Sequence, residues 1–279
     1  MHRNRTLSLS LILLTTVAFG CDEGDSAAGP ARERGLGERA PQLLAQAKLG
    51  ADLEAAPGVG PLIVDSGSSQ QQTAAAIGLP VRDKDMVGWI RWSGALPYYA
   101  GPIFDETGSQ CGEGQSGQIW YLAGTAGGPV ERDCTLPAGK QLVFPLLNYY
   151  GAVPESYYPT PEDVAAYTAD FEATGEFFRD ITCTLEVTLD GVPLYGDDLA
   201  DDTWLSVVEP FMVTLPDTED NFADWYGLVG GTTPAVGVGY YARTAPLTPG
   251  DHTLSFGGSL CFEGEVWFET HASYQLHVG

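Results

Sequence analysis

From Asp85 to the C-terminus, short apolar runs alternate with turns rich in Gly and Pro. The runs contain many β-branched and aromatic residues, which predicts strands. About nine strands are expected, at 86–92, 118–124, 140–148, 182–189, 203–209, 211–215, 234–243, 252–258 and 265–278. An Asp190-Gly191 pair predicts a tight turn into a further short strand at 192–195. The pattern is typical of an all-β domain, and about nine strands favour a β-sandwich, Ig-like or jelly-roll-like.

One segment between the strands has a helical pattern. Thr160 is a suitable N-cap, Pro161 fits the first helical position, and acidic residues follow in the first turn. The apolar residues that recur at helical spacing are Val164, Tyr167, Phe171, Phe178 and Ile181. We expect one inserted helix that covers an end or an open face of the sandwich, and that frays or breaks at Gly175.

Alternation along the strands predicts which side chains face the core. In the last strand the residues expected on the core side are Val266, Phe268, Ala272, Tyr274, Leu276 and Val278. In the strand at 182–189, Cys183 has the same parity as Leu185, Val187 and Leu189. We therefore expect Cys183 to be buried in a disulfide between the two sheets.

The N-terminus has the pattern of a secretory signal. Arg3 and Arg5 precede an apolar run over 7–19, which is shorter than the roughly 20 residues that a spanning helix needs. Ala18 and Gly20 stand three and one residues before Cys21, so we expect a signal peptide at 1–20 and a lipid on Cys21. Cleavage that leaves Cys21 as a plain thiol is the alternative, because a bacterial lipoprotein signal more often has Leu where Ala18 stands.

The residues after Cys21 are rich in Ala, Gly, Gln, Ser and Pro, which predicts a flexible linker over 21–80 before a β-domain at 81–279. The whole chain has 13 basic and 37 acidic residues. Removal of residues 1–20 takes away two arginines and no acid, which leaves a formal charge of −26. Nucleic acid is excluded as a partner, because no cluster of Lys and Arg is present to neutralise phosphates. We expect an exported protein, held to the membrane by its lipid on the periplasmic or the surface face of the cell envelope.

Four cysteines remain after Cys21, namely Cys111, Cys134, Cys183 and Cys261. An even number in an exported chain predicts two disulfides. Of the three pairings that four cysteines allow, we favour Cys111 with Cys134 and Cys183 with Cys261. A zinc site is the alternative, but the cysteines lack C-x2-C spacing and a nearby histidine.

Acidic residues offer two kinds of candidate chemistry. If no bulge intervenes, Glu263, Glu265, Glu269 and His271 share the outward face of the last strand. Carboxylates two residues apart on a strand are separated by about 6.6 Å, which is within the range of the pair that hydrolyses glycosides. A solvated polar face is the alternative. The segment around Ser116 does not have the G-x-S-x-G pattern, so a serine nucleophile is not expected there.

The acidic segment 216–224 could supply oxygen ligands to calcium from Asp217, Glu219, Asp220 and Asp224. Its order does not match an EF-hand, and solvated turns are the alternative. The acidic loop at 196–202 has the same two interpretations. No cofactor other than calcium is expected.

Paired aromatic residues stand at or beside predicted turns, at 98–99, 149–150, 157–158, 225–226 and 240–241. Such rings can stack on sugars or contact a protein partner, and they can equally fill the space between sheets and loops.

Three segments, at 111–128, 131–148 and 245–258, resemble a family of uncharacterised secreted bacterial proteins. The similarity rests mainly on the run C-T-x-P-A-G-K-x-x-x-F-P-x-x-N that begins at Cys134. The resemblance implies no activity, but it supports the interpretation that Cys111 and Cys134 are the two ends of one structural unit. Lys140, within this run, is expected to pair with a carboxylate.

Together these features predict a non-catalytic module that binds polysaccharide or another envelope protein. The alternative is a secreted glycoside hydrolase that uses the carboxylates of the last strand.

Overall fold

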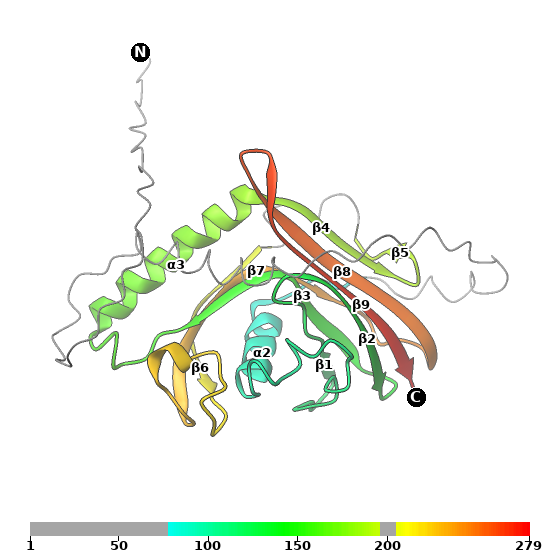
Figure 1. The fold of residues 1–279 in the computed structure, drawn as a ribbon, viewed down its shortest axis with the longest axis horizontal. Helices are drawn as coiled ribbons and strands as arrows, with labels where there is room; N and C mark the ends of the chain where they lie inside the picture. Colours follow the sequence, from blue (N-terminus) through cyan, green and yellow to red (C-terminus); the bar gives the residue numbers. More distant parts are fainter. Residues whose placement is uncertain (1–77, 196–204) are drawn as a thin grey trace, which may run out of the picture. The chain divides into compact units, whose positions relative to one another are not determined.

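The computed structural model describes residues 78–195 and 205–279. These residues form an all-β sandwich of two sheets with helix α3 inserted between two strands, as the sequence predicts (Figure 1). The four-stranded sheet has the order β1–β3–β7–β6, and the five-stranded sheet has the order β2–β9–β8–β4–β5. The strands are β1 (Ile119–Tyr121), β2 (Gly128–Leu136), β3 (Gln141–Ala152), β4 (Thr182–Leu189), β5 (Val192–Pro193), β6 (Leu205–Thr214), β7 (Thr232–Arg243), β8 (Gly250–Phe262) and β9 (Glu265–Val278). The helical segments are α2 (Asp83–Gly94), α3 (Pro161–Ile181) and the short 3-10 turn η5 (Asp224–Tyr226).

The predicted signal peptide, Cys21, almost all of the predicted linker and the acidic loop at 196–202 lie outside the described residues. Within the described residues, neither helix is long and apolar enough to cross a bilayer.

The predicted strand at 86–92 is wrong, because this segment lies in helix α2. Its buried residues Met86, Trp89, Ile90 and Ser93 recur at helical spacing, which the high content of β-branched and aromatic residues concealed. The backbone N–H of Arg82 donates to Asp85 Oδ2 at 3.1 Å, so a carboxylate satisfies a backbone group at the start of the helix.

Strand β2 was not predicted, and the two runs at 203–215 form the single strand β6. The inward side chains of β2 include Arg132, which is 4% exposed, and this charged residue hides the alternation. Its guanidinium donates to the carbonyls of Ile103, Asp105, Ala123 and Gly124 and to the hydroxyl of Tyr274. In β6 a bulge between Val208 and Phe211 accommodates Pro210, which explains why the sequence reads as two runs.

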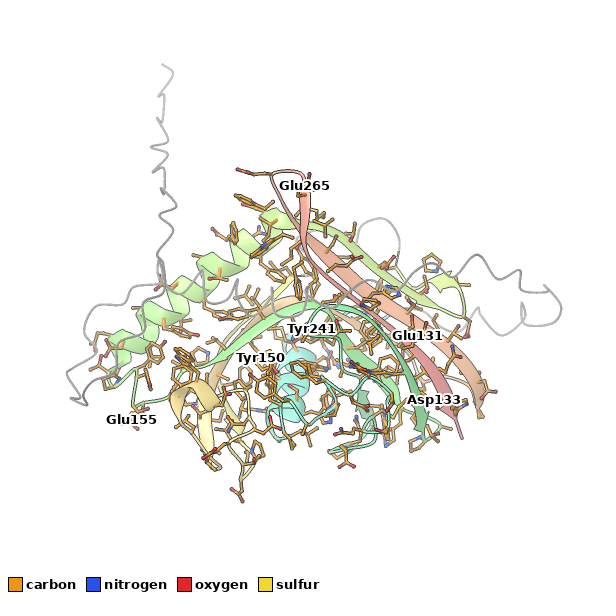
Figure 2. The ribbon with its side chains drawn as sticks, in the orientation of Figure 1. Glu131, Asp133, Tyr150, Glu155, Tyr241 and Glu265 are labelled. Carbon is orange, nitrogen blue, oxygen red and sulfur yellow. A yellow bond between two sulfur atoms is a disulfide. The ribbon has the colours of Figure 1, made fainter. Side chains whose placement is uncertain are left out.

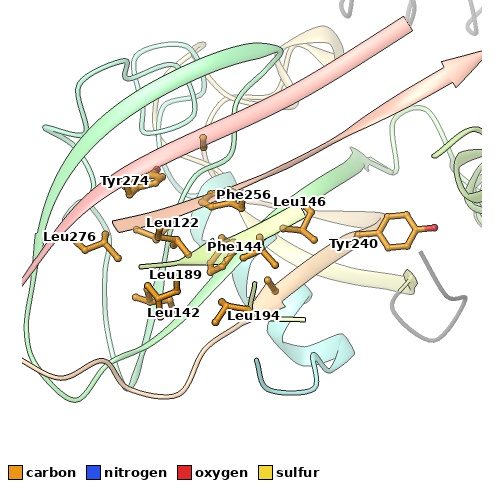
Figure 3. Packing of buried hydrophobic residues seen from close by; sticks show 14 of the residues in the cluster. Leu122, Leu142, Phe144, Leu146, Leu189, Leu194, Tyr240, Phe256, Tyr274 and Leu276 are labelled. Atoms are coloured by element: carbon orange, nitrogen blue, oxygen red, sulfur yellow. The ribbon is translucent and has the colours of Figure 1, made fainter. Parts of the chain in front are cut away.

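The main core lies between the two sheets (Figure 3). It includes Leu142, Phe144, Tyr240, Phe256 and Tyr274, and the rings of Phe144 and Phe256 are 4.3 Å apart. Strand β2 adds Cys134 and Leu136 to this core, so both sheets contribute to one continuous apolar layer.

Helix α2 covers the other face of the four-stranded sheet (Figure 1). There Met86, Trp89 and Ile90 pack against Val143, Val213 and Tyr241. Helix α3 packs on β7 and β6, where Phe171 meets Val236 and Val238 while Phe178 and Ile181 join the main core. The prediction that α3 frays at Gly175 is wrong. This glycine is buried within the helix, and a Cβ there would stand 3.1 Å from Val207 Cγ2.

Two bulges in the five-stranded sheet change the faces that alternation predicts. Leu260 pairs with Phe268 and Cys261 with Val266, so Trp267 is an extra residue in β9. Val266, expected in the core, is therefore 60% exposed. In β4 a similar shift between Thr182 and Thr184 leaves Cys183 exposed.

Both favoured disulfides are present, Cys111–Cys134 and Cys183–Cys261. The second joins neighbouring strands β4 and β8 of one sheet, so the expectation of a buried bridge between the sheets is wrong. Two disulfides are compatible with an exported protein.

Candidate functional site

The predicted aromatic pairs separate into two groups in the structure. Tyr240 and Tyr241 are each 1% exposed, and Tyr149 packs on Phe171 with 5.2 Å between the ring centroids. Figure 2 shows Tyr150 and Tyr241 in the interior beside α2. These pairs fill the core and its helix-covered flank.

Tyr158 packs on Tyr167 of α3, with 4.6 Å between the ring centroids. The other predicted aromatic residues, together with Phe104, form the candidate site, which we call the aromatic patch. It consists of Tyr98, Tyr99, Phe104, Tyr157, Trp225 and Tyr226. The rings of Tyr98, Tyr99 and Phe104 contact one another, with centroids 5.0 to 5.4 Å apart. Tyr157 lies against Tyr226 at 4.7 Å. Trp225 is 69% exposed and Tyr99 is 55% exposed, so large apolar surface is presented to solvent.

The loop between β6 and β7 carries Trp225 and Tyr226 and is bonded to the segment that carries Tyr98 and Tyr99. Its centre is Asn221, which is fully buried and donates through Nδ2 to the carbonyls of Thr218 at 2.9 Å and Leu228 at 2.8 Å. Asn221 Oδ1 accepts the backbone N–H of Ala223 at 2.8 Å, and Ala223 is also fully buried. One side chain thus fixes the turn that carries η5, which places Trp225 and Tyr226.

Asp220 connects this loop to the segment after α2. Its carboxylate accepts the backbone N–H groups of Tyr99 at 2.6 Å and Ala100 at 2.9 Å, and its carbonyl accepts the N–H of Tyr98 at 3.3 Å. These bonds fix the backbone from which the rings of Tyr98 and Tyr99 project. The patch is therefore held by specific bonds between two segments far apart in the sequence.

The patch has a negative electrostatic environment. Burial raises the pKa of Tyr98 to about 12, with further contributions from Tyr99 and the carboxylate of Asp224. Burial also raises the pKa of Tyr99, and the charges of Asp224 and Asp220 act in the same direction. Both phenols are consequently protonated at neutral pH, and their hydroxyls can donate hydrogen bonds.

The acidic residues considered as calcium ligands lie in the same loop. Asp220 uses its oxygens for backbone N–H groups, and Asp224 Oδ1 accepts the N–H of Trp225 at 2.6 Å. Asp217 and Glu219 are exposed. Within residues 78–195 and 205–279, no group of three or more His, Cys, Asp or Glu side chains is arranged to hold a metal ion. In the structure the visible role of Asp220 and Asp224 is to bind backbone N–H groups.

The carboxylates considered for glycoside hydrolysis do not share one uninterrupted strand face. Glu263 lies in the β8–β9 turn with φ of 52°, and Glu265 lies at the tip of the same hairpin (Figure 2). The bulge at Trp267 separates Glu265 from Glu269, so the single face on which the hypothesis depended is interrupted. A cavity of about 30 Å³ between the sheets is lined by residues such as Phe256, Phe268 and Thr270 and by none of these carboxylates. That volume is enough for about one or two waters.

His271 makes contacts that the sequence did not reveal. Its Nδ1 lies 3.0 Å from Glu186 Oε1 on β4, and its Nε2 lies 3.1 Å from Ser255 Oγ on β8. The sheet register places Glu186, Gly257 and His271 in one row, so the absence of a side chain at Gly257 lets the imidazole reach the carboxylate.

A serine, a histidine and a carboxylate in this order resemble the nucleophile, base and orienting acid of a hydrolase. Such an enzyme also needs hydrogen-bond donors for the oxyanion. Ser255 lies within a central strand whose backbone pairs with a strand on each side, so its backbone groups are committed to the sheet. Ser255, His271 and Glu186 thus form an ordered polar surface, and the backbone of Ser255 itself offers no free donor for an oxyanion.

Lys140, expected to pair with a carboxylate, donates from Nζ to the carbonyl of Gly117 instead. Sequence reasoning also missed Phe104, which stands alone in its segment and joins the patch only through the fold.

Comparison of the chain with protein-family models, with curated proteins and with solved structures found no match, so the resemblance to a family of secreted proteins stays a prediction.

Proposed function

We propose that this chain is an exported protein, anchored in the cell envelope through a lipid on Cys21, whose β-domain is a non-catalytic binding module. Its ligand is a polysaccharide or another envelope protein, and the aromatic patch binds it. The observation that carries the proposal is the exposure of Trp225 and Tyr99, at 69% and 55%, on segments fixed by Asn221 and Asp220.

Fixed, exposed aromatic side chains suit a binding site for two reasons. Each ring offers a large apolar area with a polar group at its edge, and aromatic residues dominate the energetics of many interfaces. A side chain that is already ordered loses little conformational entropy when a ligand binds. For Tyr99 that order comes from the bonds of Asp220 to the backbone and from the contacts of its ring with Tyr98 and Phe104.

The test measures binding of the mature chain, residues 21–279, to an array of purified bacterial envelope polysaccharides, with and without calcium. The double variant Y99A/W225A is compared with F177A, which removes an aromatic residue that is 51% exposed on α3. We expect binding by the wild type and F177A and at least about a 10-fold loss in the double variant. Equal binding by all three proteins would show that the patch is not the site. The protein alternative is tested with peptides in the next section.

The anchor is tested separately by mass spectrometry of the mature protein. We expect an acyl-modified Cys21 and release of the C21S variant from the membrane fraction. An unmodified Cys21 would remove the anchor from the proposal and leave the binding site unaffected.

A further inference from the structure

Two properties of the aromatic patch narrow the choice of ligand, and this inference rests on the proposed function. The first is charge. The carboxylates of Asp224 and Asp220 act on the phenols of the patch, and the segments that carry its rings also contain the exposed acidic residues Glu155, Asp217 and Glu219. Arg82 and Arg243 both form ion pairs with Asp85, at the start of α2. A negative surface on a chain with a formal charge of −24 favours a cationic partner and repels an anionic one.

The second property is the orientation of the rings. Tyr99 is inclined to Tyr98 by 80° and to Phe104 by 46°, and Tyr157 is inclined to Tyr226 by 75°. Sugar residues along an extended glycan stack on rings that lie nearly in one plane. Rings inclined by these angles offer separate faces and edges, which suit compact groups more than a flat chain of sugars.

We propose that the aromatic patch binds an arginine-containing segment of a second protein. A guanidinium group stacks on an aromatic face and at the same time donates a pair of hydrogen bonds to a carboxylate. Trp225 and Asp224 are adjacent in η5 and both are exposed, so an arginine-containing segment can reach both. Tyr99 supplies a second exposed face, and the charge of Asp224 already acts on its phenol.

Asp224 is the better partner for the arginine than Asp220. Asp220 uses both oxygens to bind the backbone at Tyr99 and Ala100, so its role is to hold the loop. Asp224 uses Oδ1 for the N–H of Trp225. Asp224→Asn retains an oxygen for that bond while it removes the charge.

The experiment measures binding of three fluorescent 12-residue peptides to the mature chain by anisotropy. The peptides have the same neutral sequence and carry arginine, lysine or citrulline at four positions. Citrulline has nearly the shape of arginine without its charge. We expect the arginine peptide to bind about 10-fold more tightly than the citrulline peptide and more tightly than the lysine peptide.

Variants locate the site and separate it from general attraction by charge. We expect D224N to weaken binding of the arginine peptide about 5- to 10-fold, and Y99A/W225A to weaken it more. E131Q is the matched control, because Glu131 is an exposed acid on the open face of the five-stranded sheet. Circular dichroism and the urea midpoint verify that each variant is folded.

The inference is overturned if arginine and citrulline peptides bind equally, or if E131Q weakens binding as much as D224N. In that case the proposed function can still hold with a glycan as the ligand. It holds if the wild type binds polysaccharide and Y99A/W225A does not. If neither polysaccharides nor peptides bind, both proposals fail.

Discussion

The two sheets of this domain differ in how many of their faces are covered. In the four-stranded sheet, every residue of β7 from Ala235 to Ala242 is buried, because the five-stranded sheet and α3 cover one face and α2 covers the other. In β9, buried residues from Thr270 onward alternate with exposed or half-exposed ones. A sheet with two covered faces loses the period of two in its sequence, whereas a sheet with one open face retains it.

The open face of the five-stranded sheet is polar, whereas the face of the four-stranded sheet that α2 covers is apolar. The open face presents Glu131 and Asp133 (Figure 2). Ser255, Ser273 and His277 lie on the same face. On the helix-covered face, Gly237 lies under α2, and a Cβ there would stand 2.5 Å from Ile90 Cδ1. The glycine allows the helix to approach the sheet. The comparison implies that α2 is an integral third layer, and that the open face contributes little to stability.

The strongest test of this difference replaces one tryptophan in α2 and one tryptophan in β9 of the five-stranded sheet. Trp89 of α2 is 2% exposed, contacts the rings of Tyr150 and Tyr241 and donates to the carbonyl of Leu122 at 2.8 Å. We expect W89A to lower the free energy of unfolding by about 3–5 kcal/mol. Trp267, on the bulge of β9, is 37% exposed, and W267A should cost less than half as much. Urea denaturation with the disulfides intact measures both, and equal losses would contradict a structural third layer.

A smaller effect is expected from one methyl group beneath α2. We expect G237A to lower the free energy of unfolding by about 1–3 kcal/mol, because Ile90 and Met86 must move to accommodate the added atom. The control is G112A, since a Cβ at Gly112 meets nothing within 4 Å. We expect its effect to stay within about 0.5 kcal/mol. If G237A were as neutral as G112A, the contact of α2 with β7 would be looser than the structure indicates.

The sequence predicts strands of both sheets, including all four strands of the sheet with two covered faces. It predicts neither helix α2 nor strand β2. Helix α2 was mistaken for a strand because Val87, Trp89 and Ile90 belong to residue types that are also common in strands. Strand β2 was missed because the inward Arg132 is compensated by carbonyls from distant loops, and no local pattern reports those partners.

The candidate site could be predicted only in part. The pairs at 98–99 and 240–241 are both Tyr-Tyr, yet Tyr99 is 55% exposed and Tyr241 is 1% exposed. The distinction depends on which layer covers each pair, which is a property of the tertiary structure. The bulge at Trp267, which separates Glu265 from Glu269, is likewise visible only in the strand register.

The smallest expected effect is a dependence of stability on pH that arises from histidines of the five-stranded sheet. All three histidines of the described residues lie on β8 and β9. Burial alone lowers the pKa of His252, but hydrogen bonds to Asp190 and to the Thr248 carbonyl raise it above 6.5 overall. Hydrogen bonds to Asp251 and Asp133 raise the pKa of His277.

A raised histidine pKa means that the folded protein holds the proton more tightly than the unfolded chain. The resulting stabilisation is complete below about pH 6.5 and is lost as the pH rises through the folded-state pKa. We therefore expect the urea midpoint to decrease as the pH is raised from about 6 to about 8. The decrease should be smaller than the decrease caused by W89A or by G237A. H277Q and H252Q should each remove part of this dependence, because each eliminates one imidazolium bound to carboxylates. A midpoint that rises over this range, or a slope that the double variant retains, would show that these ion pairs do not couple protonation to folding.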